Sequence, residues 1–354
     1  RLDGPNYAAV QVADHAAGMA TVRGIVAALA VRDRTGVGQR VDTSLLQAVG
    51  IYDMHNWIVW QMMIKDPDEF PNDPQGDPMR VPGLPYLPAR TKDGRWIQMA
   101  NLMDRLFPAS IHAMGLGDIY KDERFATAPA LTDENREILR RMMLERMAEK
   151  TAEEWMDLFV HEAKDVGAEP FMTTQEGMHH PQSLFNGHVV EVDDPQVGPM
   201  RQLGPLLKMR QTPPSVKGPA PLPGQHTDEV LAGLGQAKAA IDDGPASLPR
   251  HPLEGVTILD CSTVIAGPLG ASLFGELGAR IIRVETLAGD WMRRNVKGIT
   301  TNRTMGGAES ISIDLKTAKG QEIMAALVKK ADLLVHNMRP GAQERVGIGY
   351  DQVK

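Results

Sequence analysis

The last third of the chain alternates between short apolar runs and longer stretches with helical spacing. Each apolar run has the length and composition of a β-strand. Strands that alternate regularly with helices are typical of a parallel α/β sheet. The pattern predicts strands at 256–260, 280–285, 310–314 and 331–335, with helices at 267–278 and 319–330.

The first two thirds of the chain follow other patterns. An alanine-rich stretch at 15–34 predicts a helix that ends before Gly36, and the alternating residues 40–45 predict a strand. Residues 104–165 have helical spacing, whereas residues 166–225 predict short strands separated by many turns. This part of the chain is therefore expected to be less regular than the last third.

Composition excludes several classes of protein. The 354 residues include 38 Lys and Arg against 45 Asp and Glu, a net charge of −7 without a long basic run, so no nucleic-acid partner is expected. No stretch approaches the roughly 18 uncharged apolar residues of a transmembrane helix, so no membrane partner is expected. The single cysteine, Cys261, cannot form an intrachain disulfide, and we expect a cytoplasmic location.

Few residues carry recognisable chemistry by spacing alone. Asp14 precedes the predicted helix, where it is expected to cap the helix, and a helix N-terminus would also orient an ionised nucleophile. His179, His180 and His188 lack a known metal-ligand spacing, so no metal site is expected. Cys261 has no obvious partner base and is expected to be a small buried residue.

Longer motifs resemble the CaiB/BaiF family, the family III CoA-transferases. The first group, which includes Asp14, resembles the C-terminal half of that family, and the second group resembles its N-terminal half. The motifs are Ala13–Met19, Gly24–Leu29, Arg34–Asp42 and Ala220–Leu231 in the first group, then Asp260–Pro268, Ser312–Lys316, Asn337–Gly341 and Arg345–Tyr350 in the second.

This inverted order suggests the junction of a tandem fusion of two family units. The resemblance implies an α/β fold in which a Rossmann-type large domain is joined to a smaller α+β domain, and in which two chains interlock. We therefore expect an interlocked homodimer or an intramolecular pseudo-dimer. The expected division is the C-terminal part of the first large domain at 1–55, a small domain at 56–165, a return segment at 166–235, a linker at 236–250 and a second CoA-binding half at 251–354.

The resemblance also implies a mechanism. Asp14 matches the aspartate that attacks the thioester of an acyl-CoA and then carries CoA as an aspartyl thioester to a carboxylic acid acceptor. CoA and acyl-CoA are substrates, and no permanently bound cofactor is implied. By motif, the residues expected to bind CoA are Val264, Ile265, Ala266, Ile313, Lys316, Asn337, Met338 and Arg345.

The chain departs from the family pattern at several of these positions. Thr263 and Ile265 stand where formyl-CoA transferases have a His and a Gln, Met338 replaces a usual Phe, and Thr286 replaces a frequent basic residue. These changes predict altered contacts with adenine and phosphate. Lys316 and Arg345 still have the chemistry that phosphate groups require.

Three alternatives remain open. A 2-methylacyl-CoA racemase uses an aspartate at the same position, but it also needs a second proton-transfer group, and its glutamate aligns near Met103. A transferase fused to a lyase activity is a second possibility. A non-catalytic half that only completes an interlocked assembly is the third, and the presence of Asp14 argues against it for the first unit.

Overall fold

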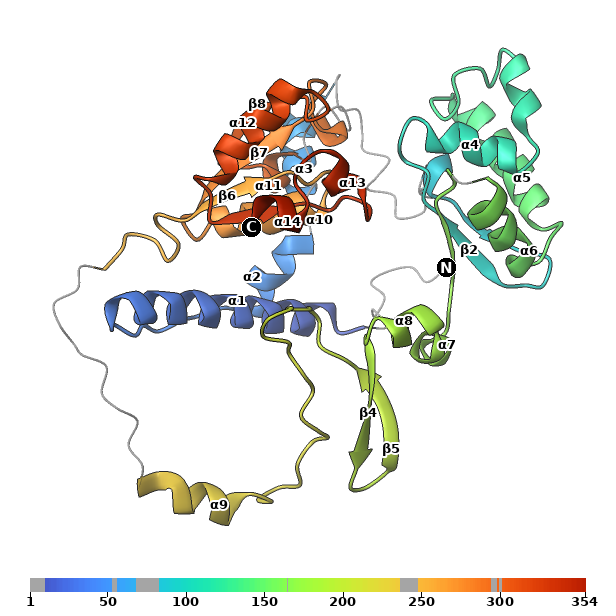
Figure 1. Ribbon diagram of the computed structural model, residues 1–354. Coiled ribbons are helices and arrows are strands. Elements are labelled where there is room, and N and C mark those ends of the chain that lie inside the picture. Colours follow the sequence, from blue (N-terminus) through green and yellow to red (C-terminus); the bar gives the residue numbers. More distant parts are fainter. Residues whose placement is uncertain are drawn as a thin grey trace. The chain divides into compact units, whose positions relative to one another are not determined.

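The computed structural model describes residues 10–52, 56–67, 83–163, 165–235, 248–293, 298 and 301–354. They form two compact units, Arg1–Pro74 with Ala239–Lys354, and Gln75–Lys238. Figure 1 labels the elements of both units. The expected linker at 236–250 lies outside the described residues except for its last three positions.

The first unit contains a parallel sheet of four strands in the order β8-β7-β6-β9. Helices join the strands because a parallel neighbour requires the chain to cross back over the sheet. The predicted succession of strands and helices is confirmed. Its elements are β6 (Thr257–Asp260), α10 (Ala266–Gly275), β7 (Arg280–Glu285), η6 (Trp291–Arg293), α11 (Thr301–Thr304), β8 (Glu309–Ser312), α12 (Ala318–Val328), β9 (Leu333–Val335), α13 (Ala342–Arg345) and α14 (Tyr350–Val353).

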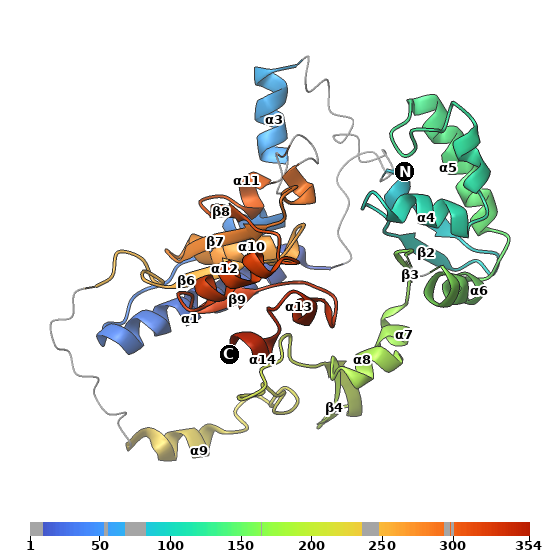
Figure 2. The same ribbon diagram turned by 45° about the horizontal axis from the view of Figure 1, so that its top comes forward.

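Successive residues of the central strand β6 are buried in two different clusters. Ile258 belongs to a cluster with Ala271 of α10 and with Ile281, whereas Leu259 belongs to a cluster with Met324 of α12. Since side chains alternate across a strand, α10 and α12 cover opposite faces of the sheet (Figure 2). This double coverage explains why the two central strands, β6 and β7, are mostly buried, and it leaves the carboxyl edge of the sheet for loops.

The long helix α1 (Val12–Thr35) belongs to the same unit as the sheet. It ends at Gly36, which takes the left-handed conformation and donates its N–H to the Arg32 carbonyl, as the sequence predicts. Arg23 of α1 forms an ion pair of 2.8 Å with Glu276, and the Arg34 guanidinium donates to the carbonyls of Pro252 and Glu254. Polar contacts therefore join α1 to the segment that carries the sheet.

The expected strand at 40–45 is wrong. Leu45 begins the helix α2 (Leu45–Val49), and the Ser44 hydroxyl caps that helix by accepting from the Gln47 N–H. Val41 lies against α1, close enough that a Cβ on Gly24 would be 2.6 Å from its side chain. The alternation therefore reflects packing against a helix. Elements η1 (Gly50–Tyr52) and α3 (Asn56–Lys65) follow.

The second unit is built around an antiparallel sheet, β1-β2-β3, and a helical core. Trp155 is buried in this core and donates its indole N–H to the Met147 carbonyl at 2.8 Å. Thr151 and Glu154 form a capping box at the start of the helix Ala152–Asp157. The unit contains η2 (Leu84–Tyr86), β1 (Pro88–Arg90), β2 (Trp96–Met99), α4 (Leu106–Ala113), η3 (Gly117–Lys121), α5 (Asp133–Met147), α6 (Ala152–Asp157), η4 (Leu158–Glu162), β3 (Ala168–Pro170), α7 (Thr174–His179), α8 (Pro181–Phe185), β4 (Val189–Asp194), β5 (Gly198–Leu203), α9 (Thr227–Ala232) and η5 (Gly233–Gly235).

Candidate functional site

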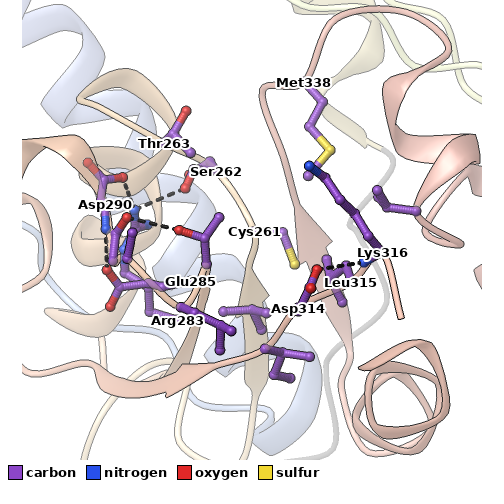
Figure 3. Close-up of a pocket in the computed structure, with 17 residues that line it drawn as sticks. Cys261, Ser262, Thr263, Arg283, Glu285, Asp290, Asp314, Leu315, Lys316 and Met338 are labelled. Carbon is purple, nitrogen blue, oxygen red and sulfur yellow. Dashed lines mark hydrogen bonds and ion pairs between the residues drawn. The ribbon is translucent and has the colours of Figure 1, made fainter. Parts of the chain in front are cut away.

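A pocket of about 390 Å³ lies at the carboxyl edge of the parallel sheet. In open parallel α/β sheets, this edge is where ligands bind. Figure 3 draws the side chains that form the pocket. They are Cys261, Ser262 and Thr263 after β6, residues 283–290 on and after β7, residues 313–316 after β8, Met338 after β9, and Val346.

Three of the eight predicted CoA-binding residues line this pocket: Ile313, Lys316 and Met338. They come from two different loops, which meet because parallel strands end at the same edge. The other five are not among the residues that line the pocket: Val264, Ile265, Ala266, Asn337 and Arg345.

Asn337 is used by the fold itself. Its side-chain amide donates to the Thr263 carbonyl at 2.8 Å, and its Oδ1 accepts from the Thr263 N–H at 2.9 Å. The side chain therefore joins the loop after β9 to the loop after β6. These two strands are neighbours at the point where the strand order reverses, so Asn337 braces the region where a ligand of this fold would sit.

A buried arginine, Arg283, forms the floor of the same region and was not among the predicted residues. Its Nη1 lies 2.5 Å from Asp260 Oδ2, and its Nη2 lies 2.6 Å from Asp290 Oδ2 and 2.9 Å from the Ser262 carbonyl. Arg283 and Asp260 are each 1% exposed. The sequence contains a signal for this network, because Arg283 interrupts the buried apolar positions of β7.

Glu285, at the end of β7, joins a second polar group. Its oxygens accept from Arg293 at 2.8 and 2.5 Å and from the Ser310 hydroxyl at 2.6 Å. The Arg293 contacts, more than any other interaction, lower the pKa of Glu285 to about 2, against the opposing effect of burial. Glu285 is therefore an anion, and its Oε1 also accepts the Asp290 N–H at 2.9 Å.

The two cations that line the pocket differ in availability. Arg283 is engaged by two carboxylates, whereas no described residue forms an ion pair with the exposed Lys316 ammonium. Figure 3 shows the polar cluster around Asp290 and Glu285 on one side and Lys316, extending towards Met338, on the other. Lys316 can therefore attract an anionic group of a ligand, beside a mostly apolar wall.

Cys261 also borders the pocket, but it is not a nucleophile. The thiol is 4% exposed, and burial is the main cause that raises its pKa to about 12. A thiol with this pKa is almost entirely protonated at neutral pH, and only the thiolate is reactive. The prediction that Cys261 is a small buried residue is confirmed.

Asp14 lies in the first turn of α1 and is exposed. Gln11 is the N-cap residue, so the expectation that Asp14 caps the helix is wrong by three positions. Asp14 does not line the pocket at the sheet edge. A different cavity, of about 690 Å³, is lined by Ala16, which follows Asp14 by two residues in α1. Leu269 and Leu273 of α10 also line this cavity.

The part of the chain that the structure describes contains no group of three or more His, Cys, Asp or Glu residues that could hold a metal ion. It also contains no helix long and apolar enough to cross a membrane. The polar groups at the sheet edge bond to each other and to the backbone. Their arrangement fits the binding of an organic anion through Lys316.

The chain is similar to several known proteins. A family model described as CoA-transferase family III matches residues 2–227 and 253–354. The chain is 34% identical over 139 residues to the succinyl-CoA–L-malate CoA-transferase alpha subunit of Chloroflexus aurantiacus, a match that covers 35% of this chain and 32% of that protein. It is 27% identical over 226 residues to the CoA-transferase/lyase DddD of a Marinomonas species, covering 61% of this chain and 26% of that protein.

A solved structure of a CaiB/BaiF family protein from Brucella suis is 28% identical, covers 30% of each chain and gives a TM-score of 0.28. The chain spans between about a quarter and a third of the length of the curated relatives named above.

Proposed function

The chain belongs to CoA-transferase family III, and we propose that it transfers CoA from an acyl-CoA to a carboxylic acid through a thioester on Asp14. The proposal is supported chiefly by the pocket at the sheet edge, which Ile313, Lys316 and Met338 line. The Lys316 ammonium, which forms no ion pair with a described residue, lies beside an apolar wall and suits a ligand that carries both phosphates and an adenine ring. The strand order β8-β7-β6-β9, third-second-first-fourth along the chain, favours a Rossmann-type nucleotide fold.

In the proposed reaction, an oxygen of the Asp14 carboxylate attacks the carbonyl carbon of the donor thioester. The carbon–sulfur bond breaks, so a mixed anhydride and the CoA thiolate form. The thiolate then attacks the aspartyl carbonyl and releases the donor carboxylate, leaving CoA on Asp14 as a thioester. The acceptor carboxylate reverses these steps and regenerates the free Asp14 carboxylate. Thioester energy is retained throughout.

The position of Asp14 supports its role. The residue lies in the first turn of a 24-residue helix, where the positive end of the helix dipole favours a negative side chain. It is also exposed, so a bulky thioester could reach it. In this proposal Lys316 binds phosphate groups, and the loop 264–266 with Asn337, Met338 and Arg345 surrounds the nucleotide.

The proposed organisation of the chain is the junction of a tandem fusion. The family model matches two separate stretches, 2–227 and 253–354, and the proposed linker lies at the gap between them. Such a fusion would assemble as an interlocked homodimer or as a pseudo-dimer within one chain. The five domain segments expected from the sequence are part of this proposal.

The experiment that tests the function is covalent trapping. The full-length protein is incubated with a panel of acyl-CoAs, treated with hydroxylamine and digested, and the Asp14 peptide is examined by mass spectrometry. We expect an aspartyl hydroxamate at Asp14 that appears only with an acyl-CoA. An unmodified Asp14, together with solvent deuterium at the α-carbon of a 2-methylacyl-CoA, would establish the racemase alternative instead.

A second candidate, a transferase that also carries out an elimination, is favoured by one observation. The 226-residue match is to a relative named CoA-transferase/lyase. In that case the donor carboxylate would leave as before, and the CoA ester of the acceptor acid would then lose a leaving group before its release. Product analysis by mass spectrometry distinguishes the two, since a simple transferase returns the acceptor acid as its unaltered CoA ester.

A further inference from the structure

The loop between β6 and α10 is fixed by side chains rather than by the sheet. From the Ser262 N–H to the Val264 N–H, each of the five consecutive polar backbone groups is bonded to a side chain. Asp260 accepts from Ser262 N–H, Arg283 donates to the Ser262 carbonyl, Asn337 bonds both polar groups of Thr263, and Asp290 accepts from Val264 N–H.

The conformation held in this way is a costly one. Val264 has φ of 70°, and it is the one non-glycine residue with positive φ among the described residues. The left-handed region is unfavourable for any residue with a Cβ, and more so for a β-branched one. Such a conformation persists only where the surroundings impose it. The Val264 N–H donates to Asp290 Oδ2 at 3.1 Å, which makes Asp290 the direct constraint.

Asp290 is itself held from two sides. Its Oδ2 lies 2.6 Å from Arg283 Nη2, and its Oδ1 accepts the Met292 N–H at 2.8 Å. Arg283 is buried, and its Nε has no hydrogen-bond partner within the described chain. A buried, unsatisfied donor and a buried charge network are poor ways to stabilise a fold, since apolar side chains often serve as well. A positional role explains better why these residues are charged.

We infer that Asp290, held by Arg283, is a positioning residue that keeps Val264 left-handed and so presents the loop 262–266 to the nucleotide part of CoA. The identity of the ligand rests on the proposed function, whereas the effect on the loop does not. The Asp290 carboxylate contacts no reacting atom in this scheme. Its action reaches the ligand only through the backbone of Val264.

The test uses Asp290→Asn in the full-length protein, with two readouts. Hydrogen exchange of the peptide that contains residues 262–266, measured without ligand, is expected to become at least tenfold faster. The dissociation constant for CoA, measured by calorimetry, is expected to rise about tenfold, as one released left-handed residue implies. Glu309→Gln is the control. It removes a carboxylate that pairs with Arg280, which lies on β7 as Arg283 does, and it is expected to change neither readout more than twofold.

Combining Asp290→Asn with a substitution at Val264 shows whether Asp290 positions the loop or only stabilises the fold. Glycine adopts positive φ without strain, so in a Val264→Gly background Asp290→Asn should weaken CoA binding less than threefold. Equal losses in both backgrounds, or unchanged loop exchange in Asp290→Asn, would overturn the inference. Arg283→Lys is the second variant in case Asp290→Asn unfolds, and the same faster exchange is expected. If the wild-type protein fails to bind CoA while loop exchange responds as expected, the proposed function fails and the positioning role stands.

Discussion

The proposed reaction requires two regions of the compact unit that contains the parallel sheet, and these regions are built in different ways. At the sheet edge, Arg283 and Asp290 are buried, and the five polar backbone groups from the Ser262 N–H to the Val264 N–H each have a side-chain partner. At the start of α1, Asp14 is exposed in a helical turn. The proposed binding edge is therefore preorganised within the sheet, whereas the proposed nucleophile is presented on an exposed helical turn. Changes at Asp14 should therefore remove chemistry alone, and changes at the edge should alter affinity and stability.

The largest effect is expected from Asp14→Asn. An amide cannot attack a thioester, so the rate of CoA transfer should fall by a factor of about a thousand or more. Because the side chain is exposed, the free energy of unfolding should change by less than about 0.5 kcal/mol. Steady-state kinetics and urea denaturation of the full-length protein measure the two quantities.

Asp33→Asn is the matched control for Asp14→Asn, because Asp33 is an exposed aspartate on the same helix, paired with Arg32 at 2.8 Å. It should retain near wild-type turnover. Equal loss of activity in both variants, or a large loss of stability in Asp14→Asn, would contradict the contrast between the two regions.

A smaller effect, on affinity, is expected from Lys316→Met. Lys316 is the pocket cation without a carboxylate partner among the described residues, so its ammonium is free to bind phosphate. Loss of one charge-assisted hydrogen bond should raise KM for the acyl-CoA about tenfold to a hundredfold, with kcat changed less than threefold. Lys319→Met is the control, since Lys319 is three residues away and pairs with Glu322 at 2.9 Å. A fall in kcat without a change in KM would place Lys316 in the chemistry rather than in binding.

The same contrast explains which features could be predicted from the sequence. The strands and helices of the sheet follow from local apolar patterns, and Ile313, Lys316 and Met338 meet because strand ends share an edge. The pairing of Arg283 with Asp260 and Asp290 joins residues 23 and 7 positions apart through side-chain geometry, which no local pattern contains. The failed strand at 40–45 has a similar cause, because Val41 packs against α1 rather than beside another strand.

The third prediction concerns the free energy of unfolding and compares substitutions at two glycines of α10. A Cβ on Gly267 would lie 2.3 Å from the Ser262 side chain, at the start of the helix, whereas a Cβ on Gly270 would have nothing within 4 Å. Gly267→Ala should therefore lower the free energy of unfolding by about 1–3 kcal/mol and weaken CoA binding. Gly270→Ala should raise it by about 0.5–1 kcal/mol, because alanine restricts the unfolded chain and favours the helix. Equal effects in urea denaturation would mean that α10 does not approach the loop so closely.

The smallest expected effect is a pH dependence of the free energy of unfolding that is caused by Glu285. The contacts with Arg293 and Ser310 hold its pKa at about 2 in the folded protein, below the ordinary value of 4.5. A depressed pKa means that the carboxylate stabilises the fold above pH 4.5 and that this contribution is lost as the pH falls towards 2. Glu285→Gln should lower the free energy of unfolding by about 1 kcal/mol at neutral pH, a modest value because Arg293 is half exposed.

Between pH 5 and pH 2, the wild-type protein should therefore lose stability more steeply than Glu285→Gln, as measured by urea midpoints across this range. Glu322→Gln, which removes an exposed carboxylate from α12, should keep the wild-type slope. If Glu285→Gln and the wild type have parallel curves, the Glu285 carboxylate does not contribute to the preorganised edge. The edge would then depend on the Arg283 network alone, and the contrast with the open end of α1 would rest on that single buried arginine.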